Sequence, residues 1–287
     1  MPTSIQKKHT GFKEVPVLSF SYSEITSRKN EKIIWASKLC DKKNRDKEGI
    51  FFTEGIKLLD EAVQSGLYIE KLFFTKKALS LYGNALESCR CDDNVLVTDE
   101  VFEKLTDEAT PQGVFAVIRK PEDFRFSQDS IKKGGFIILE DIQNPQNLGA
   151  IFRCAFSLGG KKIILSEKCA DAYGPKTLRS GMGSIFKSEF TICNDIHSFI
   201  EQQKEAGNRV FCTHLHSEAL KLGSFEFLPS DSIVIGNEGH GVSDKTAGIS
   251  SGSVIIPMAQ GAESLNAATA SSIIIWELNK AKLQDNK

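Results

Sequence analysis

The chain has 287 residues, and 36 Lys and Arg against 37 Asp and Glu give a formal net charge of −1. This length suits two domains, and the near-zero charge argues against a uniformly basic nucleic-acid binder. No apolar run reaches the roughly 18 residues that span a bilayer, and residues 1–10 lack the apolar core of a signal peptide. The seven cysteines are scattered, so we predict reduced thiols and a cytoplasmic protein without a membrane partner.

The first half of the chain alternates strands and helices after a polar start. Residues 1–23 lack periodicity and are interpreted as a flexible arm, and residues 22–40 as a helix with Ser23 as its N-cap. Strands are expected at 49–53, 69–74, 94–97 and 114–118, and helices at 54–64 and 99–105. This alternation over residues 24–120 predicts a small α/β domain.

Basic residues gather in one segment of this first half. Between Arg28 and Lys47, eight positive residues stand against three acidic ones, which leaves a local excess of five positive charges. Such a patch can hold phosphates through counterion release. A solvated helix face has the same composition, so charge alone leaves both interpretations open.

A polar stretch at residues 121–134, beginning with Pro121 and ending on Gly134, is the predicted linker. The second half, residues 135–287, again alternates strands and helices. Strands are expected at 136–139, 162–165, 185–192, 210–213, 232–235 and 254–256, and helices at 147–158, 196–205 and 265–283. The continuous apolar run at 136–139 is typical of a buried parallel strand, and Asp195 is a candidate N-cap.

Several common catalytic motifs are absent from the sequence. It contains no phosphate-binding P-loop, no G-x-G-x-x-G after a strand, no H-E-x-x-H and no G-x-S-x-G elbow. His214 and His216 would share one face of a strand, but no third ligand lies near them in sequence. A surface or packing role is therefore favoured over a metal site.

Three polar loops follow three apolar strands, within residues 139–153, 233–241 and 255–268. In open α/β sheets, ligands bind outside the carboxyl ends of the strands, so the three loops predict one shared site. Each loop alone has a plain structural interpretation. Asn147 can cap a helix after a turn, residues 236–239 can form a tight turn, and Ser264 can cap the last helix.

Together, the three segments resemble motifs one, two and three of the SpoU/TrmH-type RNA ribose 2′-O-methyltransferases of the SPOUT superfamily, in order and spacing. More weakly, residues 51–55 and 110–113 resemble a ribosomal-protein-like substrate-binding domain. The resemblance implies an α/β protein, with an RNA-binding domain at 24–120 and a SPOUT domain at 135–287. That domain would have a parallel sheet and a deep C-terminal trefoil knot.

The resemblance also implies the chemistry. The methyl donor would be S-adenosylmethionine, the product S-adenosylhomocysteine, and no metal would be required. Arg153 would be the catalytic residue. Because arginine keeps its proton at ordinary pH, its cation would stabilise the growing alkoxide, and it would act as a base only if RNA phosphate and neighbouring groups shift that proton. The other residues implied at the reacting end are Asn147, Glu238, Ser264 and Asn266.

The resemblance places the adenosine against the backbone and aliphatic side chains of the three loops. The donor-binding residues it implies are Thr213, Leu215, Gly236, Asn237, Gly239, Ile256, Pro257, Met258, Leu265 and Ala268. RNA would be held by Lys42, Lys43 and Arg45 on a loop of the first domain. A homodimer through the SPOUT domain is also implied.

Ribosomal RNA is the predicted substrate, because the two-domain layout resembles rRNA-modifying members. Transfer RNA is an alternative substrate. A non-catalytic RNA-binding or ribosome-assembly protein that keeps the fold is a second alternative, although such a binder has no evident need for the residues of the reacting end. A SPOUT enzyme that methylates a base is a third, against which the Asn-Glu-Gly and Ser-Leu-Asn signatures argue.

Overall fold

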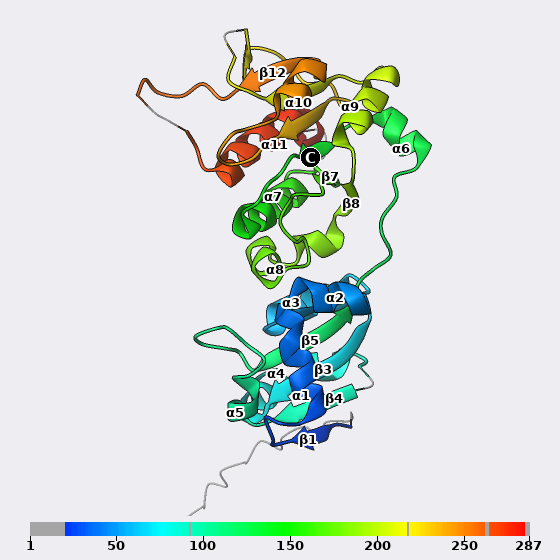
Figure 1. Ribbon diagram of the computed structural model, residues 1–287, viewed down its shortest axis with the longest axis vertical. Coiled ribbons are helices and arrows are strands. Elements are labelled where there is room, and N and C mark those ends of the chain that lie inside the picture. The colour runs from blue at the N-terminus through cyan, green and yellow to red at the C-terminus, as the bar shows by residue number, and fades with distance from the viewer. Residues whose placement is uncertain (1–20, 92, 217, 262–263, 285–287) are drawn as a thin grey trace, which may run out of the picture.

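The computed structural model describes residues 21–91, 93–216, 218–261 and 264–284. The chain forms a five-stranded sheet in its N-terminal half and a seven-stranded sheet in its C-terminal half. Figure 1 shows the two halves stacked along the long axis of the molecule, the first in blue and cyan and the second in green to red. This arrangement confirms the predicted α/β class. Within these residues, no helix combines the length and apolar character needed to cross a membrane.

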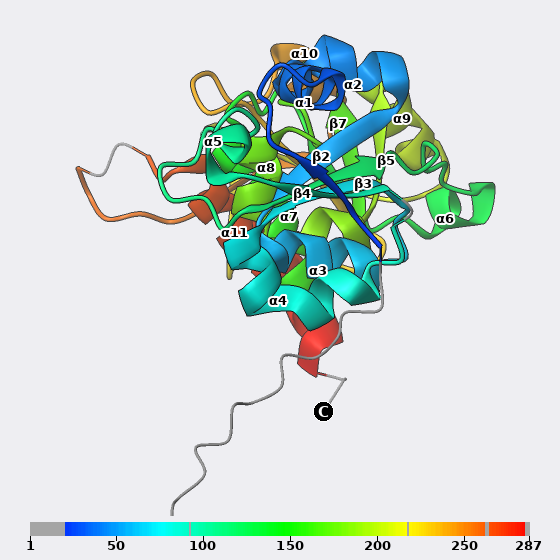
Figure 2. The same cartoon turned by 90° about the horizontal axis from the view of Figure 1, so that it is seen from below.

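The N-terminal sheet has the strand order β1-β4-β3-β5-β2, in which β5 runs antiparallel to both of its neighbours. Its elements are β1 (Ser23–Ile25), α1 (Glu31–Ser37), η1 (Lys38–Cys40), α2 (Lys42–Glu48), β2 (Ile50–Glu54), α3 (Ile56–Gln64), β3 (Ile69–Thr75), α4 (Lys76–Ser88), β4 (Asp93–Val97), α5 (Asp99–Phe102) and β5 (Val114–Arg119). Side chains alternate along β3, so Phe73 packs in the core cluster on one face and Phe74 in that on the other. Figure 2 shows α3 and α4 on one side of these strands and α1 and α2 on the other.

The helix predicted for residues 22–40 is wrong in its first part. Residues 23–25 form β1, which pairs in parallel with β4, so Ser23 is a strand residue. The helix begins at Glu31, where the Asn30 side chain accepts a hydrogen bond from the Lys32 amide at 2.9 Å. Pairing with a distant strand decided this segment against its local pattern. Residues 1–20 of the predicted arm lie outside the described residues.

The C-terminal sheet is parallel throughout, with the order β10-β12-β9-β11-β6-β7-β8. Its elements are α6 (Gln128–Lys133), β6 (Ile137–Leu139), α7 (Pro145–Ser157), β7 (Lys162–Ser166), α8 (Pro175–Gly181), η2 (Ser184–Lys187), β8 (Glu189–Cys193), α9 (Ile196–Glu205), β9 (Val210–Thr213), β10 (Leu220–Lys221), β11 (Ser232–Ile235), α10 (Asp244–Ile249), β12 (Gly252–Ile255) and α11 (Ala267–Gln284). The central strands β6 and β11 are buried over their whole length, as their apolar runs predict. The trefoil knot stays a prediction.

Several elements differ from those expected. The stretch predicted as a linker contains α6, and the strand expected from residue 185 begins only at Glu189, after a 3₁₀ turn. The N-cap of α7 is Asn144, whose side chain accepts from the amides of Gln146 and Asn147, so α7 begins two residues earlier than expected. Asp195 caps α9, which confirms that prediction.

Candidate active site

The three polar loops meet at the carboxyl ends of their strands. The Asn147 amide group on α7 donates to Glu238 Oε1 at 3.0 Å, and the Asn266 amide group donates to Asn147 Oδ1 at 3.1 Å. These bonds join residues 91 and 119 positions apart in the sequence. They are possible because β6 and β11, which precede the first two loops, are hydrogen-bonded neighbours in the sheet. The predicted sharing of one location by the three segments is therefore observed in the structure.

Glu238 holds the loop between β6 and α7 in place. The backbone amides of Gln143 and Asn144 donate to its carboxylate at 3.3 and 3.2 Å, in addition to the bond from Asn147. Burial raises the pKa of Glu238, but these hydrogen bonds to the charged form outweigh it, so the pKa lies below its ordinary value. The side chain is therefore a carboxylate at neutral pH and acts as an acceptor that connects two loops.

The turn after β11 explains the glycine and asparagine that lie there. The Asn237 side chain donates to the Asp141 carbonyl oxygen at 2.7 Å and accepts from the Gly239 amide at 2.8 Å. A Cβ on Gly236 would lie 2.2 Å from backbone atoms of Gly241 and Val242. Gly236 is therefore required by the close approach of its own loop, whether or not a ligand also lies against it.

Asn266 is the cap of the last helix. Its side chain accepts hydrogen bonds from the amides of Ala268 and Thr269 at 2.9 and 3.4 Å, and α11 begins at Ala267. The plain interpretation of Ser264 as the cap is therefore wrong. Ser264 is instead exposed at the edge of a cavity, with its hydroxyl open to an incoming molecule.

This cavity lies beside the hydrogen-bonded loops and is lined by most of the residues predicted to hold the donor. They are Thr213, Leu215, Gly236, Asn237, Ile256, Met258 and Leu265, together with Glu238 and Ser264 from the predicted reacting end. Gly239, Pro257 and Ala268, which were also predicted, are not part of the lining. Gly239 instead stabilises the turn through its bond to Asn237, and Ala268 packs against the hydrophobic core.

Sequence reasoning missed one side of this cavity. Ala267, Ala270 and Ile274 on α11 also line it. Their spacing of three and four residues places them on one face of the helix, so helical periodicity counted from Asn266 would have identified them. His214 was missed as well, although it stands between two predicted residues. No His, Cys, Asp and Glu cluster suited to a metal occurs among the described residues.

The residues present fit S-adenosylmethionine. Ile235, Ile256 and Leu265 offer aliphatic surface of the kind that stacks on an adenine ring. Thr213 and Asn237 add polar groups, as an orientation-specific ligand site requires. Leu215, Met258 and Leu265 are strongly exposed in this structure, at 80, 40 and 39%. Apolar side chains so exposed around a cavity are typical of a ligand site.

Arg153 lies on α7, six residues after Asn147, and does not line the cavity. Its side chain is exposed and makes no hydrogen bond or ion pair with the described part of the chain. The neighbouring Cys154 accepts a hydrogen bond from Ser272 of α11 at 2.9 Å, which places this turn of α7 against the last helix. The guanidinium group is therefore open to an external anion.

The three residues predicted to bind RNA differ in their exposure to solvent. Lys42 and Lys43 are exposed, but on α2 and not on a loop, and Lys42 pairs with Asp46. Arg45 is only 3% exposed, and its guanidinium pairs with Asp171 of the C-terminal half. The prediction for Arg45 as an exposed phosphate contact is therefore corrected. The next turn of α2 packs against the other half of the molecule, which charge counting along the sequence does not show.

Comparison with known proteins gives matches in both halves. Residues 135–276 match the SpoU rRNA Methylase family, and residues 30–116 match the MRM3-like substrate binding domain. A *Bacillus subtilis* relative, 23S rRNA (guanosine(2553)-2′-O)-methyltransferase RlmP, is 29% identical over 89% of this chain and 98% of its own length. A *Streptomyces viridochromogenes* relative, 23S rRNA (uridine(2479)-2′-O)-methyltransferase, is 28% identical over 90% of this chain and 92% of its own.

Solved structures agree with these matches. The SpoU methyltransferase AviRb from *Streptomyces viridochromogenes*, in complex with the cofactor AdoMet, has a TM-score of 0.77 at 26% identity, over 89% of this chain and 99% of its own. AdoMet-bound rRNA methyltransferase from Sinorhizobium meliloti has a TM-score of 0.77 at 26% identity, and the match covers 91% of this chain and 98% of its own. The predicted resemblance is confirmed. The chain therefore contains a SpoU rRNA methylase domain at residues 135–276 and an MRM3-like substrate-binding domain at residues 30–116.

Proposed function

We propose that this protein transfers the methyl group of S-adenosylmethionine to a ribose 2′-hydroxyl of ribosomal RNA. The observation that carries the proposal is the meeting of Asn147, Glu238 and Asn266 beside a cavity whose residues suit the donor. Two relatives that match over nearly their whole length are named as 23S rRNA 2′-O-methyltransferases, which supports the substrate class. Transfer RNA is the alternative substrate, because a Synechocystis relative that is 28% identical over 92% of this chain is named as an uncharacterized tRNA/rRNA methyltransferase.

Different residues of the chain bind the donor, position the reacting groups and stabilise the developing charge. S-adenosylmethionine, when bound, supplies a methyl group on a positively charged sulfur. Ile256 and Leu265 hold the adenosine, and Ser264 orients the ribose at the cavity edge. Glu238, through Asn147, keeps the helix that carries Arg153 in register with the cavity. Holding oxygen and methyl group in line supplies much of the acceleration. The methyl–oxygen bond forms as the methyl–sulfur bond breaks, the hydroxyl proton passes to solvent, and the Arg153 cation stabilises the alkoxide that develops.

The proposal is tested with the purified protein, labelled S-adenosylmethionine and rRNA from cells that lack the gene. We expect one ribose position to become resistant to alkali, and calorimetry to show binding of the donor and of S-adenosylhomocysteine. Methylation of transfer RNA alone would select that alternative substrate. RNA binding without donor binding would select the non-catalytic alternative, and a methylated base with an alkali-labile ribose would exclude ribose chemistry.

We propose that Lys42 and Lys43 bind RNA phosphates. Replacing Lys43 by alanine should weaken RNA binding and lower the slope of log K against log salt by roughly 0.7 to 0.9, the contribution of one phosphate contact. Lys42→Ala should have a smaller effect, because Lys42 already pairs with Asp46. Lys245→Ala, on the exposed surface of α10, is the matched control. A salt slope unchanged by Lys43→Ala would exclude this residue from the RNA interface.

We also propose a homodimer in which a second copy covers the last helix. Ile273 and Trp276 of α11 are 38 and 48% exposed, and their spacing of three residues places them on one helix face. Unpartnered apolar surface of this kind marks association sites. Light scattering should give the mass of a dimer for the unaltered protein and the mass of a monomer for Trp276→Glu.

We also propose a cytoplasmic location, which is supported by the seven cysteines, because all of them are free thiols.

A further inference from the structure

Arg45 is a buried charge at the junction of the two domains. Its side chain is 3% exposed, and its guanidinium lies 2.5 Å from Asp171 Oδ2. The same group donates to the carbonyl oxygens of Leu39 and Cys40 at 2.6 and 2.7 Å. A charge that is so far from solvent requires an opposite charge, and Asp171 supplies it, while the Nε of Arg45 has no hydrogen-bond partner among the described residues. The substrate-binding domain therefore presents an arginine whose counter-ion belongs to the catalytic domain.

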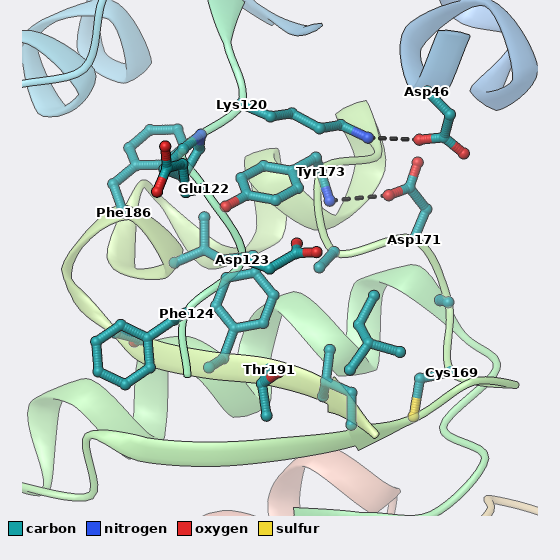
Figure 3. A pocket seen from close by; sticks show the side chains of 18 of the residues that line it. Asp46, Lys120, Glu122, Asp123, Phe124, Cys169, Asp171, Tyr173, Phe186 and Thr191 are labelled. Atoms are coloured by element: carbon teal, nitrogen blue, oxygen red, sulfur yellow. Dashed lines mark hydrogen bonds and ion pairs between the residues drawn. The ribbon is translucent and has the colours of Figure 1, made fainter. Parts of the chain in front are cut away.

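Asp171 accepts hydrogen bonds from other residues of the catalytic domain. It lies in the loop between β7 and α8, where its Oδ1 accepts from the Tyr173 amide at 3.0 Å (Figure 3). Its backbone carbonyl oxygen accepts from the Thr177 hydroxyl at 2.7 Å. One carboxylate oxygen thus binds the catalytic domain and the other binds Arg45. The ion pair connects the substrate-binding domain directly to the start of α8.

Helix α8 is in turn packed tightly on α7. A Cβ on Gly149 of α7 would lie 2.3 Å from the Thr177 carbonyl oxygen, so the two backbones are in direct contact. The Ser180 hydroxyl donates to the Gln146 carbonyl oxygen at 2.7 Å. Helix α7 carries both Asn147 and Arg153. A continuous series of short contacts therefore leads from Arg45 to the helix of the proposed reacting end.

The rest of the junction is packed only in part. The centroid of the Phe51 ring of β2 lies 4.8 Å from that of the Tyr173 ring and 5.7 Å from that of the Phe186 ring. Beside these rings is a cavity of about 480 Å³, lined by residues of both domains and of the segment that joins them. Figure 3 shows Tyr173 and Phe186 at this cavity, with the Lys120–Asp46 ion pair next to them. The cavity leaves part of the junction unfilled, so the aromatic contacts beside it and the ion pairs around it define the angle between the domains.

Among these contacts, the Arg45 pair is the most shielded from water. Arg179 of α8 lies 3.5 Å from Glu54 and 3.4 Å from Glu108, but its side chain is 34% exposed. Lys187 pairs with Glu61 and is 33% exposed. Ion pairs as exposed as these contribute little and weaken in salt, whereas loss of one partner from a buried pair is strongly unfavourable.

We propose that Arg45 is a positioning residue, which through Asp171 fixes the substrate-binding domain on α8 so that bound RNA is presented to Arg153 and the donor cavity. The inference rests on the proposed function, in which the N-terminal domain selects the RNA. Arg45 does not contact phosphate in this role. Its effect is on the geometry of transfer and not on the affinity for RNA.

The test compares Arg45→Met with Asp171→Asn in the full-length protein. Both variants break the same pair from opposite sides, and Asn retains the oxygen that accepts from Tyr173. We expect kcat to fall at least roughly 100-fold in each, because a misplacement of the RNA by only about 1 Å already has an effect of that size. RNA Kd, its salt slope and donor affinity should stay unchanged. Solution X-ray scattering should show an increased radius of gyration in both.

Arg209→Met is the matched control. Arg209 is 42% exposed and pairs with the fully buried Asp231, but both residues belong to the C-terminal half, directly before β9 and β11. Its loss should lower the unfolding temperature and leave the radius of gyration and kcat at their original values. A kcat loss of the same size in Arg209→Met would show that general destabilisation, and not domain position, explains the Arg45 variant.

Two results would overturn the proposal. One is a raised RNA Kd with a flattened salt slope in Arg45→Met and normal kcat in Asp171→Asn, which would make Arg45 a phosphate contact. The other is an unchanged radius of gyration and kcat in both variants. If the unaltered protein transfers no methyl group to any RNA, the proposed function fails, while scattering still tests the position of the domains.

Discussion

Replacing Arg153 by alanine is expected to reduce methyl transfer by roughly 100- to 1,000-fold or more, the effect of removing a donor aimed at developing negative charge. The donor affinity should stay the same, because Arg153 does not line the cavity that suits S-adenosylmethionine. Its exposed guanidinium, without a partner in the described part of the chain, is available to the ribose oxygen or an adjoining phosphate. Single-turnover transfer at saturating RNA measures the first effect, and calorimetry with S-adenosylhomocysteine measures the second.

Arg153→Lys is the matched variant. It keeps the positive charge and loses the planar fork of donors, so we expect activity between that of alanine and that of arginine. Equal loss in both variants would mean that the geometry of the guanidinium matters and its charge alone does not. Full activity in Arg153→Ala would remove the role that we assign to this residue.

Replacing Glu238 by glutamine should lower kcat roughly 10- to 100-fold, through the loss of one hydrogen bond to a charged group. Both carboxylate oxygens accept: Oε1 from Asn144 and Asn147, and Oε2 from Gln143. The NH₂ group of glutamine would face a donor on one side, so the loop before α7 should shift. The radius of gyration should stay unchanged, which separates this variant from Arg45→Met. Unchanged transfer kinetics in Glu238→Gln would contradict the role of this carboxylate.

The same residue predicts a pH dependence. The pKa of Glu238 is lowered from its ordinary value, because hydrogen bonds to the carboxylate outweigh the effect of burial. The stability that the Glu238 carboxylate contributes to the folded protein is therefore complete above the ordinary pKa of a glutamate. It is lost as the pH falls through the lower pKa of this group in the folded protein. Thermal unfolding followed between neutral and acidic pH should show this loss in the unaltered protein and a smaller one in Glu238→Gln. An identical dependence of the unfolding temperature on pH in the two proteins would contradict this role of Glu238.

Local patterns in the sequence were sufficient for much of the fold. The apolar run before Glu140 predicts a buried parallel strand, and β6 is one. Asp195 was identified as the cap of α9 from its position before an amphipathic segment. These predictions succeed because hydrophobic periodicity and capping act over a few residues, and the same rules hold wherever such a segment lies. The shared location of the three loops followed from the rule that parallel strands expose their carboxyl ends at one edge.

The sequence failed where a distant partner decided the outcome. Ser23 joined a sheet by pairing with Val95, although its surroundings suited a helix cap. The bonds among Asn147, Glu238 and Asn266 depend on the order of strands, which no local pattern contains. α11 begins at Ala267 and not at Leu265, because the side chain of Asn266 both caps it and reaches Asn147.

For this protein, the sequence by itself determined the family, the segments that form the site and the residue types available for chemistry, because all three depend on short contiguous patterns. Only the tertiary structure decided which of these residues meet and which are removed from solvent. Lys43 and Arg45 lie two positions apart on one basic helix, yet one is exposed and the other is buried against Asp171. Docking of the second domain makes that difference, since burial is a property of the folded surface and not of the residue.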